Sequence, residues 1–88
     1  MTTSHESAPD PRDELRDCRN AIEVVDRRIV ALLAQRVTLG LRAAAAKRDA
    51  GLPVKDKARE AAVIERAVAE AQAHRLPAKA VKKIFEQI

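Results

Sequence analysis

Arg36 and Lys47 are the two residues whose types and spacing first suggest chemistry. Apolar residues recur every three or four positions between Leu15 and Ala46, and Arg36 occupies the position that interrupts them. Lys47 follows eleven residues later, which is three helical turns to within about 20°, so both cations project from one stripe of a helix. A guanidinium does not lose its proton, and an arginine on an apolar stripe therefore requires an anion. That anion is either a fixed partner within the protein or a ligand.

The other positions of this stripe, which we call the apolar seam, predict a helix face that packs against another helix. Cys18 lies on the seam, so we expect a buried and inert thiol rather than a redox or catalytic one. A single cysteine also excludes an internal disulfide and a clustered thiolate metal site. The seam consists of Leu15, Cys18, Ile22, Val25, Ile29, Leu32, Leu39, Ala43 and Ala46.

Two charged residues earlier in the same helix have a structural and a functional interpretation. Arg19 and Asp26 lie seven residues apart and therefore share a helix face. Asp26 is a candidate fixed partner for Arg36, which would make the arginine structural. Arg19 taken alone is a solvated helix charge, and taken with the other cations it is a candidate ligand-binding residue.

The first helix is expected to follow a disordered tail, because residues 1–12 carry Ser, Thr, Pro and charge without periodicity. We expect the helix to begin between residues 11 and 15 and to end near Ala50. Gly51 can adopt the left-handed conformation that ends a helix, and Pro53 prevents its continuation. Roughly 36 residues at about 1.5 Å each give a helix of about 54 Å.

A second helix is predicted from about Lys57 to His74, with Asp56 as its N-cap. Arg59 occupies the position where a capping box has Glu, so the cap signal is partial. Asp56, Arg59 and Glu60 form a charged cluster that is either a helix cap with surface charges or part of a site. The inner face is expected to carry Ala61, Ile64, Val68 and Ala71, and a third helix starting near Ala78 is expected to carry Val81, Ile84, Phe85 and Ile88 on one side.

The composition predicts an all-α protein and narrows its partners. Eighteen alanines, one Phe and no Trp or Tyr indicate thin, closely packed helices. A net charge of +4 favours anionic partners, but the absence of stacking aromatics argues against nucleic acid. No run of eighteen apolar residues and no hydrophobic leader occur, so we expect neither a membrane span nor secretion but a cytoplasmic protein. We expect no metal site, because His74 has no second ligand at helical spacing.

The predicted helices leave much of the apolar seam uncovered. The second helix can cover only about 27 Å of the first, so half of the seam has no partner in its own chain. A chain of 88 residues with few bulky apolar side chains also buries too little surface to be comfortably stable alone. We therefore expect a homodimer in which the long helices pack together, and a different partner protein is the alternative.

The charged residues and the segments "IVALLAQR", "GLPVKD" and "REAAVIER" together resemble the all-helical class of chorismate mutases. The resemblance runs from Cys18 to Ile88. It implies one helical domain over 13–88 that forms an intertwined homodimer of three-helix chains, each with a long N-terminal helix. It also implies an isomerase of the shikimate pathway for aromatic amino acids, which rearranges the dianion chorismate to prephenate without a cofactor or metal. The pattern comprises Arg19, Asp26, Arg36, Lys47, Asp56, Arg59 and Glu60.

The resemblance further implies how these residues are used. Arg36, Lys47 and Glu60 are the expected catalytic residues, and Asp26 has no implied contact with the substrate. Each active site would take Arg19 from the second chain and its other residues from the first. The expected substrate-binding residues are Arg19, Arg36, Lys47, Asp56, Arg59 and Glu60.

The sequence departs from the family pattern in its third helix. Family members usually continue this helix for about two to four further turns, which bring a small hydroxyl residue and a Gln or Glu to the site. The sequence runs to Ile88, so we expect a truncated third helix and an incomplete site. Relatives of the same fold act on isochorismate as pyruvate lyases or on 4-amino-4-deoxychorismate as mutases. A non-catalytic helical dimer that regulates another enzyme is the alternative from a different class.

Overall fold

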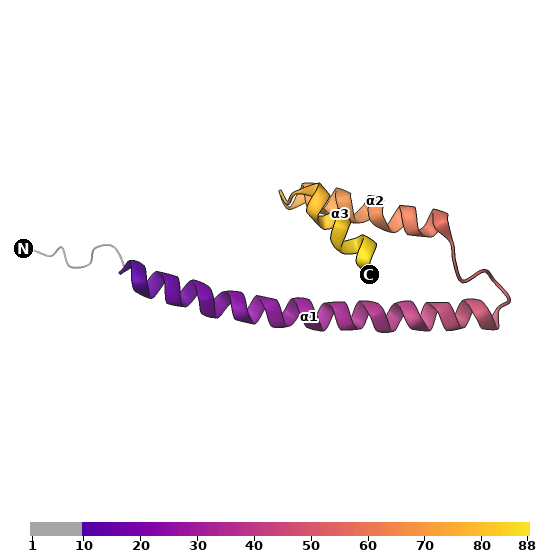
Figure 1. Cartoon of the computed structure of the whole chain (residues 1–88), viewed down its shortest axis with the longest axis horizontal. Coiled ribbons are helices and arrows are strands. Elements are labelled where there is room, and N and C mark those ends of the chain that lie inside the picture. Colours follow the sequence, from indigo (N-terminus) through magenta and orange to yellow (C-terminus); the bar gives the residue numbers. More distant parts are fainter. Residues whose placement is uncertain (1–9) are drawn as a thin grey trace, which may run out of the picture. The chain divides into compact units, whose positions relative to one another are not determined.

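A computed structural model describes residues 10–88, which form three α-helices and no strand (Figure 1). This confirms the predicted all-helical class and the long first helix. The first nine residues of the predicted tail lie outside the described residues, and its last two are helical. The elements are α1 (Pro11–Asp49), α2 (Lys57–Ala73) and α3 (Ala78–Gln87).

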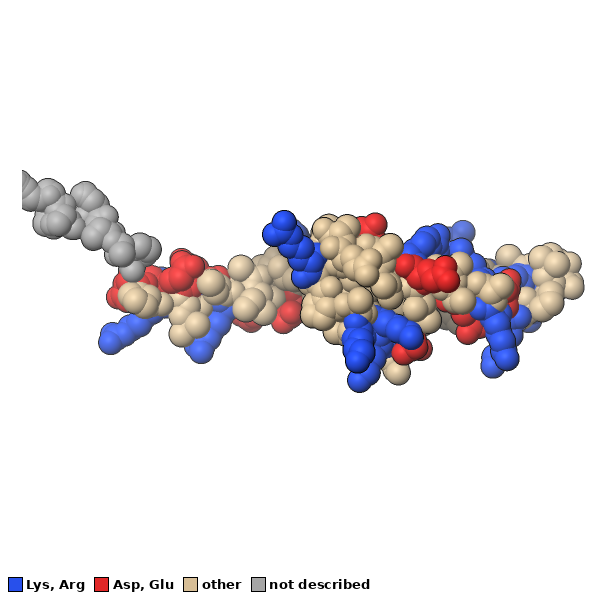
Figure 2. Space-filling model, turned by 90° about the horizontal axis from the view of Figure 1, so that it is seen from above, with Lys and Arg blue, Asp and Glu red and all other residues tan. Residues whose placement is uncertain are grey.

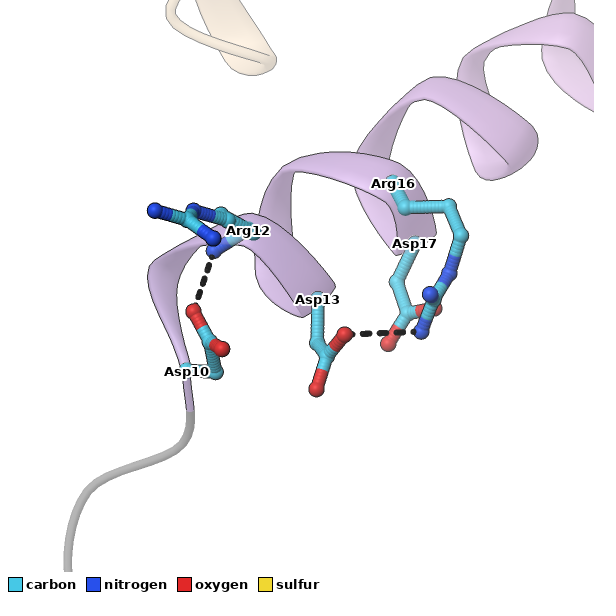
Figure 3. Close-up of polar contacts among 5 residues, drawn as sticks. All are labelled: Asp10, Arg12, Asp13, Arg16 and Asp17. Atoms are coloured by element: carbon cyan, nitrogen blue, oxygen red, sulfur yellow. Dashed lines mark hydrogen bonds and ion pairs between the residues drawn. The ribbon is translucent and has the colours of Figure 1, made fainter.

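The N-terminus of α1 is fixed by a cap that we did not predict. Oδ1 of Asp10 accepts a hydrogen bond from the backbone N–H of Arg12 at 2.9 Å (Figure 3). Asp13 in the first turn forms an ion pair with Arg16 at 3.1 Å. An aspartate cap, proline at the first helical position and acidic residues in the first turn all favour a helix start. These local signals begin α1 at Pro11, the early end of the predicted range.

The C-terminus of α1 closes with two crossed hydrogen bonds. The backbone N–H of Leu52 donates to the carbonyl of Lys47 at 2.8 Å, and that of Gly51 donates to the carbonyl of Arg48 at 3.1 Å. This is the Schellman motif, which needs a left-handed residue just past the helix. Gly51 has a φ of 71°, as the sequence predicted.

The C-terminus of α2 forms the same motif without a glycine. The backbone N–H of Leu76 donates to the carbonyl of Ala71 at 2.8 Å, and that of Arg75 donates to the carbonyl of Gln72 at 3.1 Å. Arg75 therefore has a φ of 58°, a conformation that disfavours any side chain with a Cβ. The turn between α2 and α3 consequently contains a strained residue.

The chain divides into two compact units, and the first ends at Ala34. Leu33 is half-buried, and every other described residue of this unit is exposed, including its part of the apolar seam. The predicted burial of Cys18 is wrong for the single chain: the residue is exposed, and its thiol lies 3.6 Å from Oε2 of Glu14. The physical reason is that the described residues of this unit, 10–34, contribute a single helix, and one helix cannot bury its own apolar side.

The second unit, Gln35–Ile88, contains the contact between α2 and α3 (Figure 1). Within residues 10–88 the buried residues are Ala67 and Ala71, which are 7% and 2% exposed. Of the predicted inner face of α2, Ile64, Val68 and Ala71 are buried or half-buried as expected. Ala61, which we expected on this face, is exposed, whereas Ala67, which we did not expect there, is buried.

The apolar face of α3 is only partly shielded. Val81 and Phe85 are half-buried, whereas Ile84 and Ile88, which we expected on the same covered side, are exposed. The core described in a single chain is therefore very small. A core of this size contributes little to the stability of a domain, and the expected partner stays a prediction.

The hydropathy of α1 is higher than we expected for a chain without a membrane span. Its composition includes an 18-residue window with a mean hydropathy of 1.4, which is long and apolar enough to cross a membrane. The sequence has no uninterrupted apolar run of that length, because Arg36 and Arg42 lie inside the most apolar part of α1. The core helix of a soluble protein can have the same length and apolar composition, so these two properties do not distinguish it from a membrane-spanning helix.

Candidate functional site

The second unit contains a groove of about 1470 Å³. One wall is the C-terminal half of α1, and the others come from α2, α3 and the loop before α2. Cationic side chains outnumber carboxylates along it, so the groove suits an anion. Its charged lining residues are Arg36, Lys47, Arg59, Glu60, Arg66, Glu70 and Glu86, and His74 lies with them.

The α1 wall carries the two cations that the sequence singled out. Arg36, Gly40, Ala44 and Lys47 all line the groove, and all four are half-buried. They follow one another at intervals of three or four residues, which places them on one helix face. The prediction that Arg36 and Lys47 share one stripe is therefore confirmed.

Arg36 has no carboxylate partner among residues 10–88. The ion pairs found there join Arg16 with Asp13 and Asp17, and the side chain of Glu70 lies next to that of His74. Asp26, the fixed partner that we considered, does not pair with Arg36. Five guanidinium N–H donors at the groove wall are thus available to an anionic ligand.

The ammonium group of Lys47 lies next to the loop between α1 and α2. Its Nζ donates to the carbonyl oxygen of Val54 at 3.5 Å, the long end of the hydrogen-bond range. Val54 also lines the groove. An ammonium has three N–H donors, so two remain for other acceptors. This contact holds the charge near the start of α2.

Three predicted site residues lie at the start of α2, and they have different positions relative to the groove. Asp56 caps the helix, because its Oδ1 accepts a hydrogen bond from the backbone N–H of Arg59 at 3.0 Å. Its side chain does not line the groove, whereas Arg59 and Glu60 in the first turn do. The N-cap prediction is confirmed, and the cap fixes the backbone that presents the other two residues.

Farther along α2, the groove has a polar face that sequence reasoning missed. Arg66, Glu70 and His74 recur every four residues and all line the groove. His74 Nε2 lies 3.4 Å from Oε1 of Glu70, and both side chains are largely exposed. A spacing of four residues is the available sequence signal, but it is also typical of solvated helix charges.

Arg19 and Asp26 belong to the first unit, and neither lines the groove of their own chain. Both are exposed. The contribution of Arg19 from a second chain, which the family resemblance implies, stays a prediction.

Basic and acidic side chains are mixed on the surface that Figure 2 draws. Over residues 10–88 no three His, Cys, Asp or Glu side chains come together as metal ligands. The groove brings together four basic and three acidic side chains of the described residues.

Comparison with known proteins agrees with the residue pattern. The sequence model of the family described as "Chorismate mutase type II" matches residues 18–88. The chain belongs to the chorismate mutase type II family. A relative, the "Bifunctional chorismate mutase/prephenate dehydratase" of Enterobacter agglomerans, is 32% identical over 78 residues. No solved structure matches.

The two matches differ in how much they cover. The family match includes every residue of the predicted site, from Arg19 to Glu60. The aligned segment is 89% of this chain but only 20% of the bifunctional relative, so the chain spans about a fifth of that protein's length. Membership in the chorismate mutase type II family therefore covers the helical domain, while the rest of the relative has no counterpart in this sequence.

Proposed function

We propose that this chain is a chorismate mutase, which rearranges chorismate to prephenate in a single pericyclic step. In that step the C–O bond of the ether breaks while a C–C bond to the ring forms, so no atom enters or leaves. The observation that carries the proposal is that Arg36, Lys47, Arg59 and Glu60 line one groove. These are four of the six substrate-binding residues expected from the family pattern.

Two cations on the α1 wall would hold the substrate and stabilise the transition state. Chorismate carries two carboxylates, and the guanidinium fork of Arg36 matches the geometry of one of them. The ammonium of Lys47 would donate a hydrogen bond to the ether oxygen of chorismate. Negative charge grows on this oxygen as the C–O bond breaks. Binding would also select the compact conformer in which the two reacting carbons approach each other.

The first turn of α2 would orient the ring. Glu60 lines the groove with a carboxylate that can accept a hydrogen bond from the ring hydroxyl of chorismate. Arg59 lies beside it, and its backbone is held by the Asp56 cap. Asp56 would thus act on the substrate through the position of its neighbours.

The rate gain asked of these residues is physically reasonable. A millionfold acceleration corresponds to about 8 kcal/mol of transition-state stabilisation. A hydrogen bond to a charged group contributes about 1.5–3 kcal/mol, so a few such contacts to the developing charge are sufficient.

We propose further that the active protein is an intertwined homodimer. The groove exceeds the roughly 300–1,000 Å³ of an ordinary ligand pocket, which leaves space for more than a small dianion. The apolar seam of the first unit is exposed over Leu15, Ile22, Val25, Ile29 and Leu32. If the first unit of a second chain packed along the groove, its seam would be covered and its Arg19 would join the site.

The test is an assay of purified chain with chorismate, in which prephenate formation is followed with time. Isochorismate and 4-amino-4-deoxychorismate are assayed beside it, because Glu60 favours a hydroxyl-bearing substrate only weakly over the amino analogue. We expect the chain to turn over chorismate faster than either analogue. We also propose that the enzyme is cytoplasmic. A dimer that turns over none of the three substrates would contradict the proposal and support a regulatory role.

A further inference from the structure

Gly40 occupies a position in α1 where glycine is unfavourable. A glycine inside a helix costs roughly 0.5–1 kcal/mol relative to alanine. The helix continues beyond it to Asp49, through the four alanines of residues 43–46. An alanine at position 40 would therefore make α1 more stable, so the glycine requires another explanation.

The usual structural reasons for a helical glycine do not apply to this one. Gly51, not Gly40, is the glycine with a positive φ in the described chain. A Cβ built on Gly40 meets only one heavy atom within 4 Å, Nη1 of Arg36 at 3.4 Å. No atom of α2 or α3 comes that close, so helix packing within the chain does not exclude a side chain here.

The position of Gly40 in the groove gives a functional reason. It lies one turn after Arg36 and two turns before Lys47, on the wall that carries both cations. An acceptor on the Arg36 guanidinium must approach to about 2.9 Å. A methyl group at position 40 would touch the same nitrogen and cover one side of it. The missing side chain thus leaves a notch in the α1 wall beside the guanidinium.

We propose that Gly40 is a specificity-determining residue that sets the size of the dianion accepted beside Arg36. The carbon skeleton attached to the bound carboxylate fits into the notch, and any side chain at position 40 competes with it for this space. The inference rests on the proposed function, because it takes chorismate as that dianion. It assigns Gly40 no part in the chemical step.

The experiment is a size series at position 40 with a matched series elsewhere on α1. Gly40→Ala and Gly40→Leu enlarge the side chain while improving helix propensity. Thr38→Ala and Thr38→Leu serve as controls, because Thr38 is exposed, does not line the groove and lies about 200° around the helix from Gly40. Each variant is measured for kcat and KM with chorismate, for the rise in unfolding temperature with chorismate, and for oligomeric state by light scattering.

We expect kcat/KM to fall about 5-fold in Gly40→Ala and at least about 100-fold in Gly40→Leu, mainly through KM, since overpacking costs increase with side-chain size. Protection by chorismate should fall in the same order. Without ligand, both variants should unfold at a higher temperature than the wild type. The Thr38 variants should keep kcat/KM within about 2-fold, because they change helix propensity alone.

Three results would overturn the inference. Wild-type kcat/KM and protection in Gly40→Leu would show that no ligand occupies the notch. A loss of dimer in the Gly40 variants, with unchanged kcat/KM for the dimer that remains, would show that the glycine serves contact between two copies. A wild-type chain that neither turns over chorismate nor is protected by it would remove the proposed function, and the inference with it.

Discussion

Replacing Arg36 by alanine should abolish most of the activity and leave the fold intact. Arg36 is half-buried on the groove wall and has no ion pair among residues 10–88. Its removal therefore breaks no described salt bridge. Alanine and arginine also have similar helix propensity, so the free energy of unfolding should change by less than about 0.5 kcal/mol.

The expected loss of activity follows from the contacts that Arg36 can make. A carboxylate held by two parallel N–H donors gains about 1.5–3 kcal/mol from each charge-assisted bond. Both bonds together correspond to at least about 3 kcal/mol, and each 1.36 kcal/mol is tenfold in rate. We therefore expect kcat/KM for chorismate to fall at least about 100-fold in Arg36→Ala.

Arg42→Ala is the matched control for this experiment. Arg42 lies on the same helix, carries the same charge, is exposed and does not line the groove. Both variants lower the net charge equally, so a general loss of attraction for the dianion affects them alike. Arg42→Ala should change kcat/KM less than about 3-fold. If Arg36→Ala kept its activity but lost stability, the arginine would be structural and the reasoning refuted.

Three further predictions concern the fold and the site. Arg75→Gly should stabilise the protein by about 0.5–1 kcal/mol in chemical denaturation, because it relieves the positive φ at the end of α2, whereas Arg75→Ala, which keeps the strain, should give no gain. Ile29→Asp should abolish the dimer, because an unpaired charge buried between the two chains costs several kcal/mol. Light scattering should find the wild type at about twice the chain mass of 9.7 kDa. A wild-type mass of one chain would contradict that expectation. Lys47→Arg should not restore the activity lost in Lys47→Ala, because the broad planar guanidinium does not replace a compact ammonium donor. A kcat for Lys47→Arg near that of the wild type would show that the positive charge alone suffices.

The helix boundaries were predictable because local chemistry determines them. Gly51 and Asp56 have the conformations that their sequence positions indicated, since a left-handed turn and an N-cap depend on a few adjacent residues. The start of α1 at Pro11 falls within the predicted range of residues 11–15, although Pro11 and Arg12 were also interpreted as the end of a tail. The aspartate followed by proline was the available signal.

The rotation of α2 was less predictable, because it depends on where α3 crosses it. Ala61 and Ala67 are equally acceptable on the inner face by composition, but the structure buries Ala67 and leaves Ala61 exposed. The burial of Cys18 was predicted from periodicity alone. Periodicity identifies which side of a helix is apolar, but it does not identify what covers that side.

The site was predictable where one helix carries it. Arg36 and Lys47 follow from the geometry of α1, because helical periodicity fixes their common face. Arg59 and Glu60 required the resemblance to a family, since nothing in their local spacing links them to another helix. Gly40 was not predicted at all, because its importance becomes visible only when the space beside Arg36 is known.

We propose that two chains build each site, with Arg19 from one and Lys47 from the other. The direct test mixes inactive Arg19→Ala and Lys47→Ala chains, allows subunit exchange, and measures chorismate turnover. Random exchange makes half of the dimers mixed, and each mixed dimer has one site with both residues intact. We expect the mixture to recover about one quarter of the wild-type activity at equal total chain concentration. No recovery, in a mixture shown to contain mixed dimers, would contradict it.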